Sequence, residues 1–262
     1  MTATALIAST DPWSTAELGT CPGIPVAIGG ELTPHTLLGA YRRGIFCQPR
    51  SDRASIAENQ LTYAPDVDAG YIPVLPGPGN PYAILWWSPS PRYAIPVSEI
   101  RIGRTLRKKI RRAGWTTTVN TAFDEVLAHC RADREPHWIT DDLVEALHAL
   151  HTMGWVHSVE VWHREQLVGG LYGCAMDTVF TMDSAFHTMT GAAKTAIADL
   201  AGRVALGNVQ LLDAQVRTEY TVQMGSCPIP REQYLHHLRS GRPTPGWLAH
   251  EPRAADALSD PA

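Results

Sequence analysis

The feature that most constrains the fold is a block of short apolar segments, separated by polar turns, between residues 157 and 186. Residues 157–163 alternate between apolar and polar, residues 167–176 are apolar and contain three glycines, and residues 178–186 follow a turn at Asp177. Alternation over runs of this length is typical of β-strands, and short polar breaks between such runs favour hairpins. The block therefore predicts three antiparallel strands.

Segments with helical spacing of apolar residues flank this block on both sides. The expected helices cover about residues 101–112, 120–130, 140–153, 192–206 and 232–238. A further buried strand is expected at residues 209–215, where the chain is again apolar. A mixed sheet flanked by helices is an α+β arrangement. We therefore expect residues 89–248 to form one α+β domain.

The rest of the chain predicts a second, smaller domain, since 262 residues are enough for two unequal ones. We place it at residues 1–88, with a helix that begins at Pro34 behind the capping residue Thr33. Residues 49–81 are rich in Pro and Gly and show little periodicity, so they predict a long loop insertion, which is either functional or disordered. Residues 249–262 predict a flexible tail.

The charge of the whole chain does not indicate a nucleic-acid partner, because 26 acidic residues exceed 22 basic ones. One local cluster differs, since residues 101–112 hold seven cations and no acid. Such a cluster suits phosphate, although a solvated helix face is the alternative. The candidate tRNA-binding residues are Arg104, Arg107, Lys108, Lys109, Arg111 and Arg112.

Motifs for metals, cofactors and membranes are missing from the sequence. The five cysteines form no CxxC pair and are expected to be free thiols in a reducing cytosol. His157 and His163 share a strand face, but no third ligand lies nearby. No phosphate loop, GxGxxG or HExxH motif occurs, and no apolar run approaches the roughly 20 residues of a membrane span. We expect a cytoplasmic protein with no metal or cofactor.

Two polar residues interrupt the last apolar strand. Asp213 and Gln215 stand two apart, which in a regular strand puts both side chains on the same face. A carboxylate and a carboxamide on an apolar strand are costly unless they are satisfied or functional. The pair is therefore a candidate centre of the site.

Several strings, taken in order, resemble the leucyl/phenylalanyl-tRNA–protein transferases over residues 22–248. They include GGELTP at residues 29–34, YRRGIF at 41–46, LWWSP at 85–89, WIT at 138–140, HSVEVW at 157–162, LVGGLYG at 167–173 and IPR at 229–231. Asp183, Lys194 and the pair at 213 and 215 add to these strings. Each string alone is modest, but together and in order they are specific.

The resemblance implies a C-terminal domain with an acetyltransferase-like (GNAT-like) mixed sheet. It also implies an enzyme that moves the aminoacyl group from the 3′ end of a charged tRNA to the α-amino group of an acceptor. The typical acceptor is a protein that begins with Arg or Lys, which is thereby marked for degradation by the N-end rule. An ester and an amine give an amide in a downhill reaction, so no ATP, metal or redox cofactor is needed.

The resemblance also implies roles for individual residues. An α-amino group has a pKa of about 7.7–8.0, so part of it is already neutral at cytosolic pH. A strong base is therefore unnecessary, and a hydrogen-bond acceptor near the amine nitrogen is enough to help it lose its proton. The Gln215 carbonyl oxygen fits this role, with Asp213 holding the Gln215 amide. Asp183 matches a position that is usually Glu and binds the α-amino group of the transferred amino acid. The other expected substrate-binding residues are Gln48, Trp138, Leu171, Ser184, Ala185 and Phe186.

The sequence departs from the family pattern in the expected amino-acid pocket. Gln48 replaces a Trp, while Leu171 and Ala185 replace Met residues. These changes open volume in the pocket, which the 49–81 insertion could fill. We therefore expect that the transferred amino acid is not simply Leu or Phe. A small-molecule or peptide acceptor, a non-catalytic tRNA-binding protein and an acetyl-CoA-dependent transferase are the alternatives. We expect a monomer.

Overall fold

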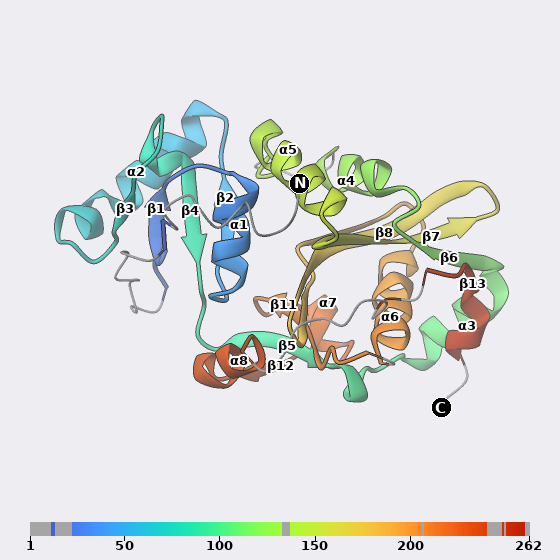
Figure 1. Ribbon diagram of the computed structural model, residues 1–262. Coiled ribbons are helices and arrows are strands. Elements are labelled where there is room, and N and C mark those ends of the chain that lie inside the picture. Colours follow the sequence, from blue (N-terminus) through green and yellow to red (C-terminus); the bar gives the residue numbers. More distant parts are fainter. Residues whose placement is uncertain are drawn as a thin grey trace. The chain divides into compact units, whose positions relative to one another are not determined.

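The structure is a computed structural model that describes residues 12–13, 23–132, 137–205, 207–239, 248 and 250–259 (Figure 1). The chain divides into two compact units. The first unit comprises Met1–Ser90 with Asp133–Thr152, and the second comprises Pro91–Ala132 with Met153–Ala262. The division near residue 90 lies close to the expected one. However, the helical segment before residue 153, which we expected in the C-terminal domain, belongs to the first unit.

A small mixed sheet forms the centre of the first unit. Its strands run in the order β2-β4-β1-β3 and comprise β1 (Ala27–Gly29), β2 (Phe46–Pro49), β3 (Val74–Leu75) and β4 (Ile84–Trp87). Helix α1 (Pro34–Tyr41) starts where the sequence predicts, because the Thr33 side chain accepts a hydrogen bond from the backbone of Thr36. It contacts α5 (Asp141–Thr152), and a short 3₁₀ helix (Pro81–Ala83) precedes β4.

The expected loop at residues 49–81 is wrong in part, because it contains helix α2 (Arg53–Asp68). The Asp52 side chain caps this helix by accepting from the backbone of Ser55. None of its residues is buried, so the apolar stripe that would reveal a helix in the sequence is missing. Tyr63 attaches the helix to the small sheet through an edge-on contact with Trp87, with ring centroids 6.2 Å apart.

A larger mixed sheet forms the second unit, which confirms the α+β class. The strands run in the order β12-β5-β11-β9-β8-β7-β6-β13, and β10 also pairs with β8. They are β5 (Arg92–Pro96), β6 (Trp115–Val119), β7 (Val156–His163), β8 (Gln166–Met176), β9 (Val179–Thr181), β10 (Ser184–His187), β11 (Leu211–Gln215), β12 (Cys227–Ile229) and β13 (Arg253–Ala254).

Helices cover both faces of this sheet (Figure 1). A Cβ at Gly169 would meet α6 (Ala192–Val204), whereas one at Gly170 would meet Val126 of α4 (Phe123–Ala132), so these two helices lie on opposite faces. The other helical elements are a 3₁₀ turn (Val97–Glu99), α3 (Arg104–Ala113), α7 (Glu219–Val222), α8 (Arg231–His237) and a second 3₁₀ turn (Ala255–Ser259).

The third expected strand, residues 178–186, is two strands. β9 pairs with the end of β8 and runs parallel to β11, while β10 returns along the earlier part of β8. Gly173 permits this arrangement, because a Cβ there would collide with the carbonyl oxygen of Thr181. The chain leaves the sheet between β9 and β10 and places Asp183 at the break.

The prediction of a flexible tail is wrong for the described residues 250–259. β13 pairs with β6, and Ala255 is completely buried. Arg203 Nη1 donates to the backbone oxygen of Glu251 at 2.9 Å. Arg203 is itself buried and pairs with Asp199 one turn earlier. A buried ion pair on α6 therefore helps to hold the C-terminal segment, which its own polar sequence does not indicate.

Arg203→Met should lower the free energy of unfolding by about 3–5 kcal/mol, because Asp199 would stay buried without its cation. Denaturant unfolding measures this change. Arg239→Met removes an exposed arginine from the same unit and should change the stability by less than about 0.5 kcal/mol. Equal, small effects in the two variants would contradict a structural role for the buried pair.

Candidate active site

Strand β11 changes its backbone geometry at the polar pair. Asp213 is opposite Ala94 of β5, but the register shifts before Gln215, which is opposite Tyr93. Gln215 has a φ of 63°, and the Val216 backbone N–H donates to the Ala214 oxygen at 2.7 Å. This hydrogen bond and positive φ define the rare, strained form of the γ-turn. The regular alternation that we predicted for the pair is therefore wrong, since a bulge separates the two residues.

Asp213 is a completely buried carboxylate with several donors around it. Arg92 donates through Nε to Oδ1 and Oδ2 at 2.9 and 3.1 Å, and through Nη2 to Oδ2 at 2.6 Å. The Tyr234 hydroxyl donates to Oδ2 at 2.8 Å. The Gln215 backbone N–H donates to Oδ1 at 2.7 Å, which fixes the turn. The acceptor sites of this carboxylate are thus occupied by protein donors.

The electrostatics of this cluster keep its charges in place. Burial opposes the charged form of Arg92, but the neighbouring Asp213 carboxylate outweighs it and raises the pKa of the guanidinium. Burial, followed by the nearby Asp213 charge, raises the pKa of Tyr234 well above its ordinary value. Both donors therefore keep their protons at neutral pH. Arg92 also lies over the Tyr234 ring, 4.8 Å from its centroid.

Asp183 lies next to Gln215 because of the break between β9 and β10. The Met182 backbone N–H donates to the Asp213 backbone oxygen at 2.8 Å, which joins this break to β11. Gln215 Nε2 then donates to Asp183 Oδ1 at 2.9 Å. The structure brings the three predicted polar residues together. It differs from our expectation in one contact, because the Gln215 side-chain amide binds Asp183 and not Asp213.

The predicted substrate-binding residues on β8 and β10 lie on two faces of the sheet. Ala185 and Leu171 are directly opposite each other, and Leu171 is part of the buried cluster that includes α6. Strand alternation turns Ser184 and Phe186 to the α4 side. There the Phe186 ring stacks on His129 of α4, with centroids 4.4 Å apart and planes 8° apart. These residues therefore do not line a single surface.

Known proteins match this chain over most of its length. A family model described as leucyl/phenylalanyl-tRNA protein transferase matches residues 94–239. Proteins named leucyl/phenylalanyl-tRNA–protein transferase from Shigella sonnei, Escherichia fergusonii and Shigella dysenteriae are each 38% identical over 218 residues, which is 83% of this chain and 81% of the relative.

The chain belongs to the leucyl/phenylalanyl-tRNA–protein transferase family. The matched region runs from β5 to the end of α8, and so contains Asp183, Asp213, Gln215 and Tyr234. Family membership confirms the resemblance and identifies an aminoacyltransferase.

Two predicted pocket residues lie in the first unit. Gln48 is half-buried on β2, opposite Leu85, and Trp138 is half-buried before α5. Their contribution to a pocket with residues of the second unit stays a prediction.

Two residues of the polar cluster, Arg92 and Tyr234, were missed as functional candidates. Arg92 follows a proline at the start of β5, and Tyr234 is a buried position of α8. They are 121 and 21 residues away from Asp213 in the chain. Arg92 stands three residues after the LWWSP string at residues 85–89, which was a weak signal, and Tyr234 had none.

The basic segment forms helix α3, as predicted. Ile110 is buried and Leu106 packs against the core, so the cations occupy the remaining faces. Arg107 donates through Nε to the Ile102 oxygen at 2.8 Å, so part of its donor capacity stabilises the start of the helix. Lys108, Arg104, Arg111 and Arg112 are exposed. The last two lie in the final turn, where the helix dipole favours cations.

Within the described ranges, no group of three or more His, Cys, Asp or Glu side chains is arranged to hold a metal ion. His157, the metal candidate considered above, contacts the Gly154 oxygen through Nε2 and the Asn120 side chain through Nδ1, each at 3.0 Å. No helix among the described residues is long and apolar enough to cross a bilayer.

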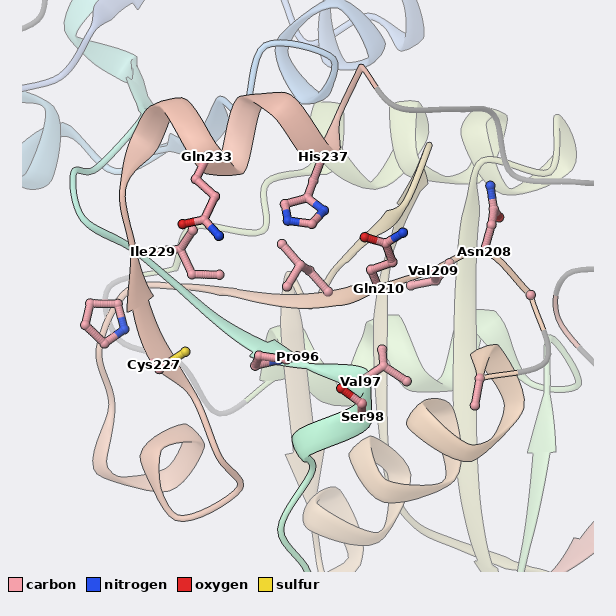
Figure 2. Close-up of a pocket in the computed structure, with 14 residues that line it drawn as sticks. Pro96, Val97, Ser98, Asn208, Val209, Gln210, Cys227, Ile229, Gln233 and His237 are labelled. Atoms are coloured by element: carbon pink, nitrogen blue, oxygen red, sulfur yellow. The ribbon is translucent and has the colours of Figure 1, made fainter.

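A separate cavity of about 730 Å³ lies under α8, at the other end of β11 from Gln215. Figure 2 shows Gln233 and His237 of α8 above it, with Gln210 and Asn208 at its side. The described residues that line it include no Lys, Arg, Asp or Glu. None of the predicted site residues lines it.

Tyr234→Phe should lower the free energy of unfolding by about 1–3 kcal/mol, because it removes a donor from the buried Asp213 carboxylate. Tyr220→Phe is the matched control, since the Tyr220 hydroxyl is buried and has no hydrogen-bond partner among the described residues. That variant should be neutral or slightly more stable. Denaturant unfolding of both proteins tests this; similar destabilisation of the two would contradict the assigned hydrogen bond.

Proposed function

We propose that this chain transfers the aminoacyl group of an aminoacyl-tRNA to the N-terminal α-amino group of a protein. Its relatives carry both the tRNA and the protein in their names. The observation that carries the proposal is the Gln215 carboxamide, which is held by Asp183 beside a buried Asp213 carboxylate. This arrangement offers a neutral acceptor at a rigid turn, which suits an amine that must lose a proton.

The reaction needs positioning more than strong acid or base catalysis. The amine nitrogen forms a bond to the ester carbonyl carbon, and the bond from that carbon to the tRNA 3′ oxygen breaks. The amine gives up one proton, and the leaving 3′ oxygen takes up one. Because an α-amino group has a pKa of about 7.7–8.0, part of it is already neutral at pH 7. An acceptor that aligns the N–H, as the Gln215 carbonyl oxygen does in this proposal, is then sufficient.

The surrounding residues support this role. Asp213 cannot leave its position, since Arg92 and Tyr234 both donate to it. It therefore fixes the turn that presents Gln215. We assign tRNA backbone contacts to the exposed cations of α3, because no acidic residue occurs in that helix to neutralise them. No metal or cofactor takes part, and we place the reaction in the cytoplasm with a monomeric enzyme.

The transferred amino acid is selected, in this proposal, by residues around Leu171 and Ala185. Alanine is much smaller than methionine, whereas leucine has about the same volume, so the room gained lies at the half-buried Ala185, opposite Leu171. We infer that the enzyme accepts side chains beyond Leu and Phe. Incubation with a panel of charged tRNAs and with peptides that begin with Arg, Lys or Ala, followed by mass measurement, tests the function. A strict preference for Leu and Phe would contradict the wider selection only, whereas no product from any pair would contradict the function.

Gln215→Ala should reduce the transfer rate about a hundredfold, because the amine loses its acceptor. Binding of charged tRNA should persist, which a filter or fluorescence titration measures. Gln233→Ala removes an exposed glutamine of α8 and should leave both properties unchanged. Unaltered turnover of the first variant would remove Gln215 from the mechanism.

Replacing Lys108 and Arg111 with Glu should weaken tRNA binding and reduce the slope of log K against log salt by about one for each phosphate that the helix no longer neutralises. The control replaces the exposed Arg53 and Arg239 with Glu, which gives the same change in net charge elsewhere. Equal effects of the two double variants would identify α3 as an ordinary solvated helix face.

A further inference from the structure

The two carboxylates of the site hold different parts of Gln215. Asp213 Oδ1 accepts from the Gln215 backbone N–H at 2.7 Å, and so fixes the main chain of the turn. Asp183 Oδ1 accepts from Gln215 Nε2 at 2.9 Å, and so fixes the side chain. The two contacts come from different strands, since Asp213 belongs to β11 and Asp183 precedes β10.

The contact with Asp183 decides which end of the carboxamide faces outward. An ionised carboxylate accepts hydrogen bonds and donates none, so it selects the NH₂ end of the amide. The Gln215 carbonyl oxygen must then point away from Asp183. A carboxamide that was free to flip would also present its NH₂ group to the amine, and two donors would then face each other.

Asp213 cannot take over this task. Its two oxygens already accept from Arg92, Tyr234 and the Gln215 main chain. A carboxylate offers about four acceptor sites, and these contacts occupy them. Asp213 is also completely buried, so it meets neither substrate.

We propose that Asp183 is a positioning residue that locks the Gln215 carboxamide with its carbonyl oxygen toward the acceptor amine. This inference rests on the proposed function and deepens it. It gives Asp183 a task within the protein, beside the contact with the α-ammonium group of the donor that the family resemblance implies. The acid therefore acts through Gln215 and not on the reacting ester.

A reciprocal exchange tests the inference. Asp183→Asn lets the amide at position 215 flip, and Gln215→Glu puts two carboxylates within hydrogen-bonding distance, where they repel each other. Each single change should lower kcat at least tenfold with phenylalanyl-tRNA and a peptide that begins with Arg. The double exchange places a carboxamide at 183 that donates to a carboxylate at 215, so kcat should recover about tenfold relative to Gln215→Glu. It should stay below that of the wild type, because a carboxylate beside the amine favours the ammonium form. Failure of this recovery would overturn the inference.

A donor without an α-ammonium group separates the two tasks of Asp183. Phenyllactyl-tRNA carries the same side chain and ester but a hydroxyl in place of the amine. If Asp183 positions Gln215, Asp183→Asn lowers kcat equally with both donors. If Asp183 only binds the α-ammonium group of the donor, the variant raises KM for phenylalanyl-tRNA and not for phenyllactyl-tRNA, and the inference is wrong.

The controls keep this result apart from misfolding and from failure of the proposed function. Glu165→Gln makes the same chemical change in the exposed β7–β8 turn and should leave kcat unchanged. Thermal unfolding of all variants shows whether each one folds. An inactive wild-type protein would contradict the proposed function itself, whereas an active wild type with an equally active Asp183→Asn variant would contradict only the inference.

Discussion

The buried ion pair between Arg92 and Asp213 is the constraint on which the site depends. Removing two charges from water costs several kcal/mol each, and only close geometry with further hydrogen bonds offsets this cost. Arg92 on β5 supplies a bidentate contact, and Tyr234 on α8 supplies another donor. The first strand of the second unit, a strand near its end and a C-terminal helix must therefore meet at one point. Once Arg92 and Tyr234 donate to Asp213, the carboxylate that accepts from the Gln215 backbone is already in position.

The same carboxylate explains the unusual backbone at Gln215. A non-glycine residue at positive φ in a γ-turn costs about 1–3 kcal/mol, and persists only where the surroundings over-determine it. Here the Asp213 side chain accepts from the Gln215 backbone, and the register shift against β5 lengthens this part of β11. The rigid pair thus keeps a strained turn in place. Strain of this kind at the proposed acceptor group is consistent with a site that is organised before the substrates bind.

Local patterns in the sequence predicted the elements but not the contacts among them. The apolar run around Leu211 and Leu212 predicted β11, and the polar pair within it indicated the candidate site. The bulge depends on a hydrogen bond that no periodicity reveals, and Arg92 lies 121 residues away. Helix α2 buries none of its residues, so it had no apolar stripe to read. The C-terminal segment depends on pairing with β6 and on Arg203, which are both distant in the chain.

The choice of a carboxamide at position 215 follows from the charges around it. An amine attacks only as the neutral base, and a carboxylate in contact with it would favour the ammonium form. A carbonyl oxygen of an amide aligns the N–H and adds no charge. The two acids nearby do not undo this, because Arg92 neutralises Asp213 and the Gln215 amide stands between Asp183 and the position we assign to the amine. In the proposed mechanism, negative charge thus stays one hydrogen bond away from the attacking amine and is not in direct contact with its nitrogen.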